Sequence, residues 1–246
     1  MEKEISIKTS DKKLIYGTLG KSKNKSDRLV IFVHGFTGHQ NEHIFFNGSK
    51  FLAEKGCDTF RFNLYGWQKG ARHFKDVKIS LHGKDITTVV KYFRKKYKKI
   101  FLIGHSYGGT SLLFAETELV DGLVFWDASY IDSRYAQEDL GYDKKTGKYI
   151  YDFGIEYFVG KEFIDEIRNF PDCGDLIKKI HKPVLFIVSG RQGNVKAEQQ
   201  YFIQANKPKA RVNIKHADHC FDNWEDEKRL LDETWAWLES QEIKDK

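Results

Sequence analysis

The sequence predicts an α/β protein built on a mainly parallel, doubly wound sheet. Short apolar runs of strand length alternate with segments of helical spacing along most of the 246 residues. One apolar run, Ile100 to Ile103, ends in the pattern Gly-x-Ser-x-Gly, and a helix-compatible run follows at once. A strand, a tight turn and a helix in this order place a serine at the carboxyl edge of the sheet, where ligands of doubly wound proteins bind.

The N-terminal half opens with a predicted hairpin, because Ile5 to Lys8 and Lys13 to Thr18 flank an Asp-Lys-Lys turn. Arg28 to Val33 is a continuous apolar run, which is typical of a strand that helices bury on both faces. The elements expected before the Gly-x-Ser-x-Gly turn are a helix at about 44–55, a strand at 57–64, a loop at 65–74 and a helix at 85–97. Strands and helices that alternate in this way predict parallel neighbours.

After the turn we expect a helix over 110–117 and a buried strand over Gly122 to Trp126. The alternation breaks over 129–179, which we interpret as a small inserted lid within one domain that spans 1–246. The insertion contains a predicted hairpin at 141–153, a helix at 157–170 that stops before Pro171, and ten aromatic residues that form a mini-core or line a substrate pocket. The sheet then resumes at 184–188, followed by a helix at 195–206, an edge strand at 211–215 and an amphipathic helix at 224–239.

Charge and hydropathy argue against a nucleic-acid-binding protein and against a membrane protein. Lys plus Arg exceed Asp plus Glu by 41 to 35, and the densest basic run, 91–99, reads as the solvated face of a helix, so no nucleic-acid partner is expected. Apolar runs stay well short of the ~20 residues that a bilayer span needs, so no membrane insertion is expected. The first residues lack the apolar region of a signal peptide, and the three cysteines are an odd number. These features predict reduced thiols and a cytoplasmic protein.

The Gly-x-Ser-x-Gly turn makes Ser106 the candidate nucleophile. Glycines two residues before and after the serine leave room for a strained turn, which projects the hydroxyl from the sheet. The backbone N–H of Tyr107 then lies at a helix N-terminus, where it can donate to an oxyanion. A structural glycine-rich turn is the alternative interpretation of the same pattern.

A second glycine-bearing loop, His34 to Gln40, follows the strand that ends at Val33. Its position, one strand–helix–strand repeat before the serine turn, is where a serine hydrolase supplies its second oxyanion donor. The backbone N–H of Phe36 is the candidate, and an ordinary strand-to-helix loop is the alternative.

A serine hydroxyl becomes a strong nucleophile only when a base takes its proton. His219 is the candidate base, because it lies in the loop after the last predicted strand and follows the serine in chain order. His216, His219 and Cys220 lack a partner cluster elsewhere, so no metal site is expected. His105 is expected to point into the sheet and to be structural.

Together these motifs make the chain resemble an α/β-hydrolase, and more narrowly the bacterial cinnamoyl/feruloyl esterases and the monoacylglycerol-lipase-like hydrolases. The resemblance spans nearly the whole chain and rests on the segments His34–Gly38, Asn63–Gly66, Gly104–Gly109, Lys182–Ile187 and Ala217–Phe221. It implies hydrolysis of a small-molecule ester without a cofactor, but it does not imply which ester.

One position departs from the family pattern. The resemblance places the triad acid in a Gly-x-x-Asp loop after the strand at 184–188, and Gly193 occupies that place here, with Asn194 beside it. An amide cannot supply the charge that stabilises an imidazolium. Asp127 stands at the end of the strand beside the serine strand, a placement that some α/β-hydrolases use. We therefore predict Asp127 as the acid that orients His219, the alternative being an Asp that caps the next turn.

Other carboxylates are weaker candidates for the acid, namely Asp218, Asp132 and Asp222. The sequence as a whole predicts a serine esterase that acts on esters of modest size with an apolar or aromatic acyl group. A thioesterase or amidase would use the same residues, and a hydrolase-fold binding protein without turnover also stays open because of Gly193. The oligomeric state, a homodimer included, is left open.

Overall fold

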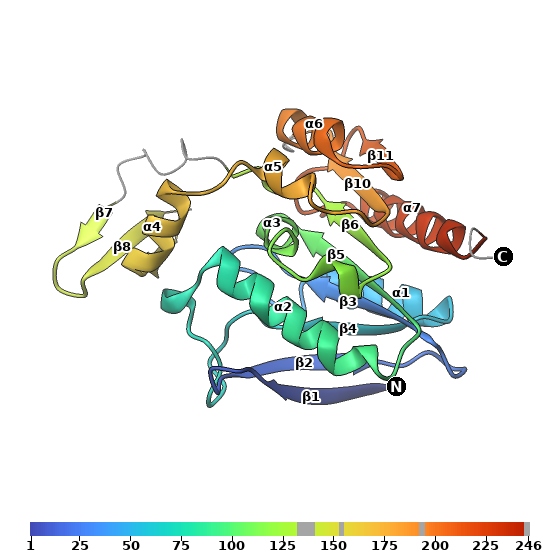
Figure 1. The fold of residues 1–246 in the computed structure, drawn as a ribbon, viewed down its shortest axis with the longest axis horizontal. Helices are drawn as coiled ribbons and strands as arrows, with labels where there is room; N and C mark the ends of the chain where they lie inside the picture. Colours follow the sequence, from blue (N-terminus) through green and yellow to red (C-terminus); the bar gives the residue numbers. More distant parts are fainter. Residues whose placement is uncertain (132–140, 153–154, 192–194, 244–246) are drawn as a thin grey trace.

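The computed structural model describes residues 1–131, 141–152, 155–191 and 195–243, and its centre is a sheet of eight strands (Figure 1). The strand order is β1-β2-β4-β3-β5-β6-β10-β11. All neighbours from β4 to β11 run parallel, while β2 is antiparallel to both β1 and β4. The strands are β1 (Glu2–Lys8), β2 (Leu14–Gly20), β3 (Arg28–Val33), β4 (Asp58–Phe62), β5 (Lys99–His105), β6 (Gly122–Trp126), β10 (Val184–Ser189) and β11 (Lys209–Ile214). The predicted α/β class, with its N-terminal hairpin and mainly parallel doubly wound sheet, is confirmed.

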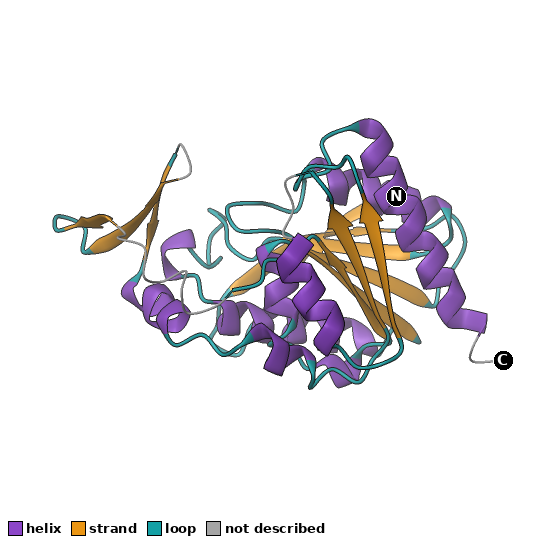
Figure 2. Cartoon of the chain, turned by 90° about the horizontal axis from the view of Figure 1, so that it is seen from above, coloured by secondary structure: helices purple, strands orange, loops and turns teal. Residues whose placement is uncertain are grey.

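Helices cover both faces of this sheet (Figure 2). They are α1 (His43–Glu54), α2 (Ile79–Arg94), α3 (Tyr107–Leu112), α5 (Cys173–Ile177), α6 (Val195–Gln204) and α7 (Trp224–Ile243), with short 3-10 turns η1 (Phe74–Asp76) and η2 (Thr117–Leu119). Two separate apolar clusters result, one containing residues of α2 and α3 and the other residues of α1 and α7. Successive residues of β3 alternate between the clusters, because side chains of a strand point to opposite faces.

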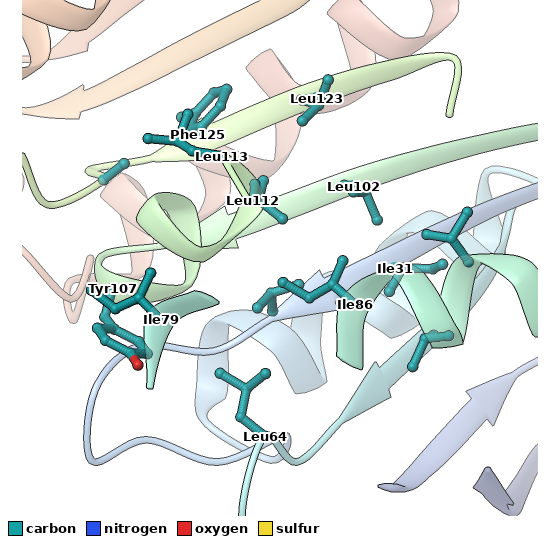
Figure 3. Packing of buried hydrophobic residues seen from close by; sticks show 14 of the residues in the cluster. Ile31, Leu64, Ile79, Ile86, Leu102, Tyr107, Leu112, Leu113, Leu123 and Phe125 are labelled. Atoms are coloured by element: carbon teal, nitrogen blue, oxygen red, sulfur yellow. The ribbon is translucent and has the colours of Figure 1, made fainter. Parts of the chain in front are cut away.

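The cluster on the α2 and α3 face carries the serine turn (Figure 3). Ile86 of α2 and Leu112 of α3 pack there against Leu102 of β5 and Leu123 of β6, all fully buried. The strand that ends just before Ser106 is therefore held between neighbouring strands and a helical layer, which gives Ser106 a rigid support.

The insertion forms a second, three-stranded antiparallel sheet beside the main body, with strand order β7-β8-β9 (Figure 1). Its elements are β7 (Gly141–Asp143), β8 (Lys148–Asp152), β9 (Glu156–Val159) and α4 (Lys161–Arg168). The predicted helix over 157–170 is wrong in its first turn, because Glu156 to Val159 pairs with β8. Aromatic and β-branched residues suit a strand, and helical spacing begins only after Gly160.

Two helices near the serine differ from their predicted bounds. The helix after the turn is α3, which begins at Tyr107 and ends at Leu112 rather than covering 110–117. The helix before β5 begins at Ile79, six residues earlier than predicted, because residues 79–86 already turn their apolar side inward. Within the described part of the chain, none of the helices has the length and apolar character to cross a membrane.

Candidate active site

The turn after β5 holds Ser106 in a left-handed backbone conformation with a φ of 53°. Such a φ is costly for a non-glycine residue and needs support from its surroundings. Glycines permit that support: a Cβ on Gly108 would lie 2.3 Å from the carbonyl oxygen of Val33, and one on Gly104 would lie 2.7 Å from the amide nitrogen of Gly109. The close packing of turn, strand and helix projects the serine out of the sheet.

Three side chains from three different strand ends form one line of hydrogen bonds. His219 Nε2 lies 2.9 Å from Ser106 Oγ, and His219 Nδ1 lies 2.5 Å from Asp127 Oδ2. The Asp127 carboxylate is fully buried, whereas a third of the His219 side chain is exposed. The structure thus brings together the three residues that the sequence proposes as nucleophile, base and acid.

The Asp127 carboxylate is held by the end of the neighbouring strand β10. Ser189 donates its backbone N–H to Oδ1 at 3.1 Å and its hydroxyl to Oδ2 at 2.7 Å. The backbone N–H of Asp127 donates in turn to the carbonyl of Ile187 at 2.8 Å. Because burial removes the hydrogen bonds that water would give this carboxylate, the two donors of Ser189 replace them.

His219 is also held through its backbone. His105 Nε2 donates to the carbonyl oxygen of His219 at 2.8 Å, so the residue before Ser106 anchors the loop of His219. Burial lowers the pKa of His105 to about 4, which keeps its ring neutral. The sequence predicts a structural role for His105. In the structure its ring lies next to that of His219, with 4.9 Å between the ring centroids.

The loop after β3 approaches the serine closely on the other side. A Cβ on Gly35 would lie 3.3 Å from the Cβ of Ser106, so only glycine fits there without displacement. The next residue is Phe36, whose ring packs against Tyr107 at a centroid distance of 5.3 Å. The two candidate oxyanion donors therefore belong to neighbouring residues that flank Ser106.

The side chains behind these loops are buried and neutral. His34 Nδ1 donates to the carbonyl of Gly35 at 2.8 Å, and its Nε2 accepts from the N–H of Leu64 at 3.0 Å. The Tyr107 hydroxyl lies 3.0 Å from Nδ1 of the buried His82. Desolvation lowers the pKa of His34 to about 4 and that of His82 to about 3.

The site geometry agrees with a comparison of the sequence to protein families. A sequence model described as the alpha/beta hydrolase family matches residues 30–233, from β3 to the final helix. The chain belongs to the alpha/beta hydrolase family. A search of curated proteins gave no match.

Solved structures of other hydrolases and esterases resemble the chain over nearly its full length. The esterase Est1E from Butyrivibrio proteoclasticus with ferulic acid bound is 22% identical with a TM-score of 0.84, covering 97% of this chain and 99% of Est1E. The esterase domain of a Rhodothermus marinus protein is 21% identical with a TM-score of 0.75, covering 96% and 97%. A dienelactone hydrolase from Anabaena variabilis is 15% identical with a TM-score of 0.71, covering 98% and 97%. At these identities the similarity shows the fold alone.

A pocket of about 840 Å³ in this alpha/beta hydrolase opens beside the loop of Phe36. Its walls come from the loops after β3 and β4, from η1 and from strand β9 of the insertion. The aromatic lining residues are Tyr65, Trp67, Phe74, Tyr157 and Phe158, and the others include Thr37, Asn63, Gln68, Lys75 and Glu156.

Several residues that the sequence raised as alternatives do not meet the base. Asp218 Oδ1 accepts backbone N–H groups of its own loop, and Asp222 contacts His43 at 3.1 Å. Gly193, Asn194 and Asp132 lie outside the described residues. Tyr135 and Phe153, two of the ten aromatic residues of the insertion, also lie outside them.

Sequence reasoning missed two serines of this hydrolase site. Ser189 is the last residue of a strand that reads as uniformly apolar, and Ser129 lies two residues after Asp127 with its Oγ 3.2 Å from Ser106 Oγ. A usable signal existed in the polar residue that ends each run, since carboxyl ends of parallel strands meet at the same edge.

We expect Ser189→Ala to lower kcat by about 10- to 100-fold with little change in KM, because hydrogen bonds to charged groups contribute roughly 1.5–3 kcal/mol. Ester hydrolysis measured over a range of substrate concentrations tests this. The control is Ser49→Ala, which removes another buried hydroxyl, bonded to Thr59 at 2.5 Å on the far side of the sheet. Equal activities of the two variants would show that Ser189 does not support the acid.

We also expect the free energy of unfolding to fall as the pH drops from 7 to 5. His34, His82 and His105 have pKa values of about 4, 3 and 4 in the folded chain against an ordinary 6.5. The unfolded chain therefore binds more protons below pH 6.5, so stability is full above that pH and is lost as the pH falls toward 4. The loss at pH 5 is roughly 2 kcal/mol per histidine.

Urea unfolding at the two pH values measures this effect. Carboxylates titrate in the same range, so the comparison that isolates a histidine is His82→Phe, which should show a smaller difference between pH 7 and pH 5 than the wild type. An identical pH dependence in the variant would contradict the assignment of a neutral, buried His82.

Proposed function

We propose that this chain is a serine hydrolase that cleaves carboxylic esters of modest size through an acyl-enzyme at Ser106. The observation that carries the proposal is the continuous hydrogen-bond line from Ser106 through His219 to the buried Asp127. This line supports the proposal despite Gly193, because the carboxylate of Asp127 lies 2.5 Å from His219 Nδ1. It supports an enzyme over a hydrolase-fold protein that only binds.

In the first half of the proposed reaction, Ser106 Oγ attacks the ester carbonyl while its proton passes to His219 Nε2. The carbonyl oxygen becomes negative, and the backbone N–H groups of Phe36 and Tyr107 donate to it. Asp127 holds the Nδ1 proton of His219, which fixes the tautomer and stabilises the imidazolium. The intermediate collapses, and the proton on Nε2 leaves with the alcohol.

In the second half, a water molecule takes the place of the alcohol beside His219. Nε2 accepts its proton as it attacks the acyl carbon, and the same two amides donate to the second oxyanion. The bond between the acyl carbon and Ser106 Oγ breaks, the proton returns to Oγ, and the carboxylic acid departs. No step of this sequence needs a cofactor.

We assign the acyl group to the 840 Å³ pocket, whose lining begins at Thr37, next to Phe36, and does not include Ser106 or His219. His219 follows β11, at one edge of the sheet, while the pocket walls follow β3 and β4 on the other side of β5. The leaving alcohol must meet His219 Nε2 to receive its proton, so the acyl group points away from the base. A large pocket with aromatic walls fits an apolar or aromatic acyl group.

The insertion is the proposed lid of this pocket. Tyr157 and Phe158 of β9 line it, and the ring of Tyr157 packs against Phe74 at 5.5 Å between centroids. Tyr151 and Phe163 pack on Phe36 at 6.0 and 5.5 Å. Contacts of this kind couple the insertion to the oxyanion loop.

The first test is kcat/KM on a short-chain nitrophenyl ester for three proteins. We expect the wild type to turn over, Ser106→Ala to be inactive, and Asp127→Asn to lose about 10²- to 10⁴-fold, because an amide fixes the wrong tautomer of the base. Full activity of Asp127→Asn would remove Asp127 from the mechanism. A wild type that is silent on several chain lengths would contradict the proposed function itself.

The pocket assignment predicts that Phe74→Ala lowers kcat/KM about tenfold for nitrophenyl esters with an aromatic acyl group, and much less for the acetate, because truncation removes a partly buried aromatic wall of the pocket. A series that varies the alcohol of acetate esters should be unaffected. Phe51→Ala is the control, since Phe51 is partly buried on the opposite face of the sheet. Equal losses for all acyl groups would place the acyl group elsewhere.

A further inference from the structure

The hydroxyl of Ser129 lies against the nucleophile. Its Oγ is 3.2 Å from Ser106 Oγ. Ser129 follows Asp127 by two residues, so both residues come from the end of β6. The backbone N–H of Ser129 donates to the carbonyl of Ser106 at 3.1 Å, so the two serines are held together by main chain as well. This contact is additional to the triad.

Proton accounting fixes the direction of the hydroxyl contact. The proposed mechanism requires the tautomer of His219 that has its proton on Nδ1, facing the Asp127 carboxylate, and a bare Nε2 facing Ser106. Ser106 therefore directs its single proton to Nε2 at 2.9 Å. Its oxygen has only lone pairs left, and the hydroxyl of Ser129 must be the donor of the 3.2 Å contact.

The hydroxyl is not needed to hold Ser129 in place. The carbonyl oxygen of Ser129 accepts from Thr110 Oγ1 at 2.5 Å and from the Tyr201 hydroxyl at 2.8 Å, and its N–H is already bonded to Ser106. These three backbone hydrogen bonds hold Ser129 in position. The half-buried side chain is left to face the reacting oxygen.

We propose that Ser129 is a fourth catalytic residue, whose hydroxyl donates to Ser106 Oγ whenever that oxygen gains negative charge. The inference rests on the proposed serine-hydrolase function. During acylation the Ser106 proton moves to His219 Nε2 while the bond from Oγ to the carbonyl carbon forms, and Ser129 stabilises the charge on Oγ at the start of that step. Ser129 keeps its own proton throughout.

The same hydroxyl acts again when the acyl-enzyme breaks down. Ser106 Oγ is then the leaving group: the bond from the acyl carbon to Oγ breaks, the electron pair moves onto Oγ, and His219 returns a proton to it. A donor already positioned at Oγ stabilises this departure, as microscopic reversibility requires. Removal of the hydroxyl should therefore slow both half-reactions.

The test uses Ser129→Ala, which removes the hydroxyl and leaves the backbone anchors. Two rates are measured: labelling of Ser106 by a fluorophosphonate, which needs no knowledge of the ester substrate, and turnover of a nitrophenyl ester. We expect both rates to fall by about 10- to 100-fold with KM little changed, somewhat less than the loss of an oxyanion donor. Ser129→Thr, which retains a hydroxyl, should recover most of the labelling rate.

Tyr201→Phe is the matched control, because it removes a hydrogen bond to the Ser129 carbonyl but keeps the Ser129 hydroxyl. It should label at nearly the wild-type rate. Urea midpoints of the three variants report whether each remains folded. Labelling of Ser129→Ala at the wild-type rate, with the wild type active on esters, would overturn the inference and leave the proposed function standing. A wild type that labels but turns over no ester would contradict the ester-hydrolase proposal, while the labelling rates would still decide the role of Ser129.

Discussion

The site depends on the pairing of β6 with β10, which places the fully buried carboxylate of Asp127 against Ser189. A charge removed from water is stable only where donors replace the lost solvent, and here the end of β10 supplies an N–H at 3.1 Å and a hydroxyl at 2.7 Å. Every residue of β6 and of β10 is buried, and this burial fixes the register in which the two strands pair. The hydrogen bond to Asp127 orients the ring of His219. The orientation of that ring in turn places Nε2 within 2.9 Å of Ser106 Oγ.

The same pairing explains how an acid can stand on β6 rather than after β10. The two strands are neighbours, so their carboxyl ends are one strand spacing apart, and a side chain from either can reach a histidine that arrives from the loop after β11. In this chain the strand that usually supplies the acid supplies Ser189 as its hydrogen-bond partner instead. The carboxylate that meets His219 therefore comes from the end of β6, and the end of β10 supplies its hydrogen-bond donors.

Sequence reasoning predicted the parts of the fold that local pattern determines. The bounds of β3 and β6 are those predicted, because each is a continuous apolar run between polar residues. Strand β9 was missed because its aromatic residues also fit the helical spacing that continues into α4. Ser106, His219 and Asp127 could be proposed from the Gly-x-Ser-x-Gly motif, from their places after predicted strands and from the resemblance to the α/β-hydrolases. Ser189 was visible as the polar residue that ends its apolar run, but its bond to Asp127 was not predictable. That bond and the contact of Ser129 with Ser106 depend on which strand ends are neighbours in space, as does the anchor from His105 to the His219 carbonyl.

The residues that follow the adjacent strands β5 and β6 both have a positive φ angle. Ser106 after β5 has a φ of 53°, and Asp127 after β6 has a φ of 41°. Each left-handed residue costs on the order of 1–3 kcal/mol and turns its side chain out of the alternation of its strand. The main chain links the two, since Ser106 N–H donates to the carbonyl of Trp126 at 3.0 Å and Ser129 N–H donates to the carbonyl of Ser106 at 3.1 Å. The two strained turns are therefore linked, so a change that relaxes either one should displace Ser106 and Asp127 together and disturb the hydrogen bonds of both to His219.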